Sequence, residues 1–207
     1  MSPDAQSARD DLAFLRAIAG GDETVQMRTF GEAYFAAGLI YGGQMLLHAA
    51  QAMGFLRGDS LWGLAVGLGP SVLFAPVLAA IIWRHRKERL SGAVSRAVGG
   101  VFGAVGLANL FLIVVIGSVA WRQHSVQTWL IYPCCVFVLQ GLAWQFAFVM
   151  RRRVWFAAVA AGWFVCAVAM AVSIATVGWF ILFAGLGLWL CMALPGWVLL
   201  RASKSAA

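Results

Sequence analysis

The sequence predicts an all-α membrane protein, a bundle of six transmembrane helices preceded by a short amphipathic helix. Of its 207 residues, 62% are hydrophobic and 11% are charged, whereas soluble domains are about half apolar and about a quarter charged. Six stretches reach the ~20 mostly apolar residues that a helix needs to cross a bilayer. We therefore divide the chain into a cytoplasmic segment (1–32), a transmembrane bundle (33–200) and a cytoplasmic tail (201–207).

The cytoplasmic segment is predicted to contain one helix, at about Ala8–Ala19. Ser7 and Asp10 match the acidic form of a capping box, and Gly20 with Gly21 supplies a stop. A helix of this length is marginal on its own. We expect it to lie on the bundle or the membrane surface, or to bind a cytoplasmic partner protein. Its apolar stripe consists of Leu12, Leu15 and Ile18.

The six spans are separated by short loops, so no soluble domain is inserted between them. We predict them at Ala33–Phe55, Leu61–Trp83, Ala97–Trp121, Trp129–Met150, Val154–Thr176 and Gly178–Leu200. The last break, around Val177, is the least marked. Without it the chain has five spans, and its C-terminus lies on the other side of the membrane.

The positive charges favour six spans. Thirteen of the fifteen Lys and Arg residues fall on one side of this arrangement, leaving only Arg57 and Arg122 on the other. Lys and Arg collect on the cytoplasmic side, so both termini are predicted to be cytoplasmic. The net charge of +7 therefore reflects topology and contact with anionic lipids, not nucleic acid. Compactness and alanine richness favour a bacterial inner membrane.

Small residues and prolines predict how the spans pack. Glycines four residues apart allow helices to approach closely, and they occur as Gly38/Gly42, Gly63/Gly67 and Gly99/Gly103. Pro70 and Pro76 predict that the second span is kinked or partly unwound. Three tryptophans far from the ends of the spans are expected to pack inside the bundle: Trp144, Trp163 and Trp189.

A polar stripe on the first span is the best candidate for a site. It consists of Tyr41, Gln44, His48 and Gln51. At about 100° per residue these four fall within an arc of roughly 80°, with Tyr34 near the same line. Polar groups in hydrocarbon need partners or water, so this face is predicted to point inward.

Three interpretations of the stripe stay open. His48 fixes the helix register by bonding to a backbone carbonyl or to Gln140, or the stripe lines a cavity for a small neutral or aromatic ligand. In the second case Asn109 and Gln140 are the expected contacts on the opposite wall. The third is ligation of a metal or haem by His48, but His85 and His124 lie in loops on opposite faces. We expect no cofactor and no metal.

The acidic residues argue against an enzyme or an ion-coupled pump. None of the eight lies deep in a predicted span, and Glu32 is the nearest. Ion-coupled transport and general acid–base catalysis usually need such groups. Cys134 and Cys135 are adjacent and form no C-x-x-C motif. They are expected to be buried thiols or, on the oxidising side, a disulfide. We predict no catalytic residue.

One tripeptide recurs in the two halves of the bundle. Leu39-Ile40-Tyr41 in the first span matches Leu130-Ile131-Tyr132 in the fourth. Spans one to three and four to six have opposite topology, as in inverted-repeat transporters. Beyond the tripeptide the halves do not align.

The segment Asp10-Asp11-Leu12-Ala13-Phe14-Leu15-Arg16 resembles the start of small multi-span proteins of bacterial inner membranes with an Asp-Leu-Ala-Phe helix. That group is often encoded beside winged-helix regulators, and the resemblance implies no catalytic residue. We expect an interaction or regulatory subunit whose polar core senses a small molecule. The alternative is a carrier or channel for a small neutral solute along the Tyr41–Gln51 face. The expected partners are the lipid bilayer and a cytoplasmic or membrane protein, with oligomerisation left open.

Overall fold

The computed structural model describes residues 23–56, 60–86 and 92–205, and every regular element in these ranges is helical. The elements are α2 (Glu23–Ala52), α3 (Ser60–His85), α4 (Ala93–Gln123), α5 (Val126–Arg151), α6 (Val154–Val172), α7 (Val177–Leu188), the π-helix η1 (Trp189–Ala193) and α8 (Leu194–Ser205). The predicted helix carrying Leu12, Leu15 and Ile18 lies outside the described residues.

Each predicted span coincides with a helix. The uncertain break is confirmed, because α6 ends at Val172 and α7 begins at Val177. α7, η1 and α8 follow one another without interruption and form the last span, so the described chain has six long helices. Five of them, within α3, α4, α5, α6 and Val177–Ser205, are long and apolar enough to cross a membrane. α2 is not among these five, since its Tyr, Gln and His side chains lower its hydropathy.

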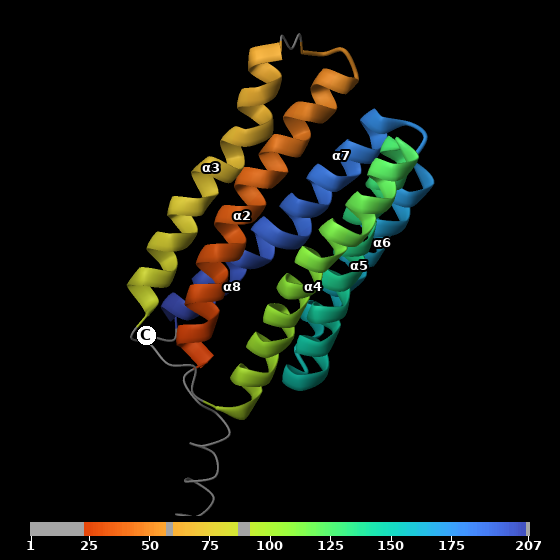
Figure 1. Ribbon diagram of the computed structural model, residues 1–207. Helices are drawn as coiled ribbons and strands as arrows, with labels where there is room; N and C mark the ends of the chain where they lie inside the picture. The colour runs from red at the N-terminus through yellow and green to blue at the C-terminus, as the bar shows by residue number, and fades with distance from the viewer. Residues whose placement is uncertain (1–22, 57–59, 87–91, 206–207) are drawn as a thin grey trace, which may run out of the picture.

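Two groups of helices make up the bundle (Figure 1). α2 packs against α3, α7, η1 and α8, whereas α5 packs against α4 and α6. α6 joins the two groups through its contacts with α7 and η1. α3 and α4 are peripheral, and most of their apolar side chains face outward. α2 and α5 are not close backbone neighbours, which leaves room between them for side chains and for a cavity.

The two ends of the bundle differ in charge. The C-terminal helix ends beside the start of α2 (Figure 1), and we call this the inner end and the opposite one the outer end. Most described Lys and Arg residues lie near the inner end, on α2, α3, α4, α5 and α8 and in the turn between α5 and α6, and the outer end carries Arg122.

Close helix packing is confirmed at one of the three glycine pairs. A Cβ built on Gly38 lies 2.3 Å from Ala193 N, and one on Gly42 lies 2.1 Å from Trp189 Cδ1. α2 therefore approaches η1 so closely that only glycine fits. The prediction is wrong for Gly63, Gly67 and Gly103, where a Cβ meets no atom within 4 Å, so no neighbouring helix requires glycine at these positions.

The prolines act differently from the prediction. α3 is continuous through Pro70 and Pro76, so partial unwinding of the second span is wrong. The irregular turn is instead η1, two residues before Pro195, where proline cannot donate to the carbonyl four residues earlier. Trp144 and Trp163 are buried as expected, at 1% exposure. Trp189 is 44% exposed, so its predicted burial is wrong.

Candidate functional site

A cavity of about 600 Å³ lies beside the polar face of α2, and we call it the central cavity. Tyr41 and Gln44 line it from α2, and Gln140 lines it from α5. Further walls come from α3, α6, α7 and η1, but no residue of α4 contributes. The inward orientation predicted for the first half of the stripe is therefore observed. Ligand pockets usually have about 300–1,000 Å³.

The wall of the central cavity is aromatic and uncharged. None of the residues that line it is acidic, basic or His. Such a wall suits a neutral ligand, because a charge at this depth is costly without a partner. Its aromatic members are Tyr34, Tyr41, Phe74, Tyr132, Phe137, Trp163 and Phe180.

Gln44 links α2 to α3 by a hydrogen bond at the edge of the cavity. Its Nε2 donates to the carbonyl oxygen of Gly67 at 3.1 Å. Pro70 lies one turn further along α3 and lacks an N–H, so the carbonyl it leaves without a backbone donor is that of Val66, the residue before Gly67. Gln44 therefore adds a second donor to the Gly67 carbonyl and does not replace the donor that Pro70 lacks. Close by, Tyr41 meets Phe74 edge to face, with ring centroids 5.3 Å apart.

Gln140 is held by Tyr34. The Tyr34 hydroxyl donates to Gln140 Oε1 across the bundle, linking α2 to α5. The prediction that Gln140 pairs with His48 is therefore wrong. Because the carbonyl oxygen of Gln140 faces Tyr34, its amide Nε2 remains available, and it bonds to no described residue.

An aromatic cluster closes the space between α2 and α5 on the inner side of the cavity. Phe30 stacks on Tyr34 at 4.3 Å and meets Phe102 of α4 at 4.5 Å between ring centroids. Trp144 lies against both Phe30 and Tyr34, and Phe156 packs on Trp144. We call these five residues the inner aromatic cluster.

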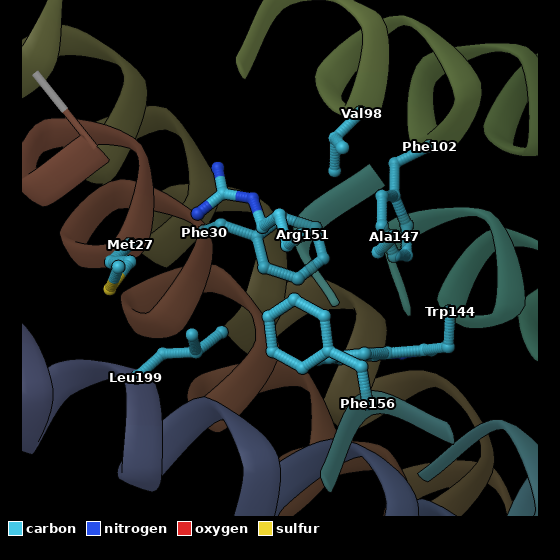
Figure 2. A pocket seen from close by; sticks show the side chains of 9 residues that line it. All are labelled: Met27, Phe30, Val98, Phe102, Trp144, Ala147, Arg151, Phe156 and Leu199. Carbon is cyan, nitrogen blue, oxygen red and sulfur yellow. The ribbon is translucent and has the colours of Figure 1, made fainter. Parts of the chain in front are cut away.

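A small void lies beside the inner aromatic cluster. It has about 30 Å³, with Arg151 among the residues around it (Figure 2). This space admits a water molecule but no organic ligand. The central cavity is therefore closed toward the inner end.

The outer half of the predicted stripe is not part of the cavity. His48 Nδ1 lies 3.2 Å from Gln51 Oε1 on the same helix, so neither reaches another helix through this contact. The expectation that His48 bonds to a backbone carbonyl or to Gln140 is not met. Asn109 does not line the cavity either, and its buried Oδ1 has no partner among the described residues.

Most residues of the cavity wall were not predicted as site residues, and among the described ones Trp163 has a buried polar group without a partner. Trp163 lies at the middle of α6, is 1% exposed, and has an indole N–H without a hydrogen-bond partner among the described residues. A tryptophan in an apolar helix is most often a packing residue, so only the position of its N–H could have singled it out.

A polar contact at the inner end also joins α2 to α3. Glu32 Oε2 lies 3.0 Å from Nε2 of the buried His85, and Glu32 Oε1 lies 3.5 Å from Arg28 Nε. The sequence placed His85 in a loop, but the structure extends α3 to include it. This contact lies away from the central cavity.

The described residues form neither a metal site nor a disulfide. The described residues contain no group of three or more His, Cys, Asp or Glu side chains that could hold a metal ion. Cys134, Cys135, Cys166 and Cys191 are all free, so the two adjacent cysteines form no disulfide in this structure.

Comparison of the chain with known protein families, with curated proteins and with solved structures finds no match. The chemistry of the central cavity is therefore the main guide to function.

Proposed function

We propose that this chain is a six-span protein of a bacterial inner membrane that binds a small neutral ligand in its central cavity. Through that ligand it acts as an interaction or regulatory subunit and not as an enzyme. The observation that carries the proposal is the uncharged, aromatic cavity of about 600 Å³ beside the polar face of α2.

Several features support the membrane arrangement. α2 lacks the hydropathy of the other five spans, but its polar residues face the cavity, or each other, as an inner span requires. The start of α2 and the end of α8 share one end of the bundle (Figure 1), and that end carries most described positive charges. Both observations support cytoplasmic termini.

Closure of the cavity favours binding over passage. The inner aromatic cluster fills the space between α2 and α5 below the cavity, so no continuous polar path follows α2. The protein partner is proposed to dock on Leu12, Leu15 and Ile18, on the sequence grounds given above.

The second candidate is a carrier for a small neutral solute. It is favoured by one observation: both tyrosines of the repeated tripeptide, Tyr41 and Tyr132, line the central cavity. A carrier must open the inner aromatic cluster in each cycle. Flux of a neutral solute into proteoliposomes would then fall on filling the cavity, and would persist after deletion of residues 1–21.

The proposal is tested by filling the cavity. Val136 lines it, whereas Val138, two residues further along α5, is 41% exposed and does not. We expect a small molecule to co-purify with the wild-type protein and with Val138→Trp in mild detergent, detected by mass spectrometry of the extract. Val136→Trp should lose that molecule while retaining the fold. Equal recovery from both variants would refute the proposed site.

A further inference from the structure

We infer that the ligand of the central cavity is an uncharged planar ring bearing carbonyl oxygens, attached to an apolar tail, and that it enters sideways from the lipid. A substituted benzoquinone with an alkyl tail is the simplest member of this class. The inference rests on the proposed function and specifies the ligand of the same site.

The free hydrogen-bonding groups of the cavity are mainly donors. The Trp163 indole N–H is buried without a partner, and the Gln140 amide Nε2 bonds to no described residue. A buried donor left unpaired costs about 1–3 kcal/mol. The Trp163 N–H is covered in this structure, so a ligand gains affinity from it by displacing the covering side chains slightly and accepting its hydrogen. Carbonyl oxygens accept hydrogen bonds without carrying a charge.

The donors come from different sides of the cavity. Trp163 belongs to α6 and Gln140 to α5, and the hydroxyls of Tyr41 and Tyr132 make no bond to described residues. Gln44 uses one of its two amide hydrogens on Gly67, so it keeps one N–H and its oxygen. A ring with more than one carbonyl oxygen can therefore accept from more than one wall.

The shape of the wall suits a flat ring. Tyr41 and Phe74 form one aromatic pair of the wall, and Phe137 and Trp163 form another with centroids 4.7 Å apart. Flat ligands stack on such rings in offset or edge-to-face arrangements. An organic cation could also contact them, but the wall has no carboxylate to offset its desolvation at this depth.

The depth of the cavity determines how a ligand reaches it. Phe74 and Trp163 lie near the middle of α3 and α6, far from both membrane surfaces. α3 and α5 both line the cavity but are not packing neighbours, and α4 contributes no wall residue. With the inner end closed, we place the entrance between α3 and α5, on a side of the bundle that faces hydrocarbon in the proposed arrangement, where only a lipid-soluble molecule approaches.

The test compares two probes with the same tail. The full-length protein in phosphatidylcholine nanodiscs is titrated with radiolabelled decyl-dimethoxybenzoquinone or decylbenzene, and empty nanodiscs provide the background. We expect saturable binding of the quinone and much weaker binding of decylbenzene. Trp163→Phe, which removes the N–H and keeps the ring, should weaken quinone binding about 3–10-fold, as expected for one hydrogen bond. Gln140→Leu should act in the same direction.

Trp144→Phe is the matched control. Trp144 is equally buried, but it lines the small inner void and not the central cavity. Its ring packs on Tyr34 of the cavity wall, and phenylalanine keeps that ring contact. Quinone affinity should be unchanged in this variant. Equal binding of both probes, or tight binding of tetraethylammonium in place of the quinone, would overturn the inferred ligand class.

Val136→Trp separates this inference from the proposed function. If it abolishes binding of both probes while Trp163→Phe affects neither, the cavity binds ligands but the carbonyl requirement is wrong. If Val136→Trp changes nothing, both the ligand class and the proposed site are wrong.

Discussion

Aromatic side chains occupy the space between α2 and α5 at two levels, with opposite results. At the inner level, Phe30, Phe102 and Trp144 pack on one another and leave about 30 Å³. At the middle level, Tyr41, Phe137 and Trp163 line the wall of a cavity of about 600 Å³. The same type of side chain fills space in one place and encloses it in the other.

The difference lies in which helices take part. α4 inserts Phe102 into the inner cluster, but no α4 residue reaches the middle level. On α2 and α7, the positions facing the cavity include Ala33, Ala37 and Ala184, which are too small to fill it. The cavity therefore exists because α4 contributes no side chain at the middle level and because small residues face it. The number of aromatic side chains matters less.

The largest effect on stability is expected when an aromatic ring is removed from the inner aromatic cluster. Trp144→Ala should lower the free energy of unfolding by about 3–5 kcal/mol, because a fully packed aromatic side chain is removed. Tyr41→Ala, at the half-exposed cavity wall, should cost less than half as much. Reversible unfolding in mixed micelles measures both. Equal losses would mean that the two levels are packed alike.

A smaller effect is expected at the close contact between α2 and η1. Gly38→Ala places a Cβ 2.3 Å from Ala193 N and should destabilise the protein by about 1–3 kcal/mol through overpacking. Gly103→Ala is the matched control, since its Cβ meets nothing within 4 Å. It should be neutral or slightly stabilising in the same unfolding assay. Destabilisation by Gly103→Ala would indicate a helix contact that this structure lacks.

The hydrogen bond between α2 and α3 is expected to contribute still less to the free energy of unfolding. Gln44→Leu removes the bond to the Gly67 carbonyl, and interhelical bonds of this kind average about 0.6 kcal/mol. Its clearer consequence is a looser α3, since α2 is the main neighbour of that helix. Spin labels at exposed Leu47 and Val72 should report a broader distance distribution in Gln44→Leu than in Tyr41→Phe, which keeps the bond. Identical distributions would contradict this role of Gln44.

The smallest effect is expected outside the cavity. His48→Leu removes only a contact with Gln51 on the same helix, so both the stability and the ligand affinity should stay within about 0.5 kcal/mol of wild type. A large loss of affinity would mean that the binding site extends along the whole stripe. The unfolding and nanodisc assays above provide both measurements.

The sequence by itself determined the class of fold and the positions of the six long helices, because length and apolar composition decide whether a segment can cross a bilayer. It also determined that the polar residues of α2 share one face, which follows from helical periodicity. That was enough to predict that Tyr41 and Gln44 face inward, whereas the cavity that they line with Gln140 was one of three open interpretations.

Only the tertiary structure decided which partners those residues meet. Periodicity gives the direction of a side chain but not the distance to the next helix, so it did not show that His48 bonds within α2 or that Tyr34 binds Gln140. Nor did it distinguish Gly38, pressed against η1, from Gly63, which faces open space. The orphaned N–H of Trp163 at the cavity wall arises from the packing of α6 against helices distant in sequence, since a cavity is a property of several helices at once.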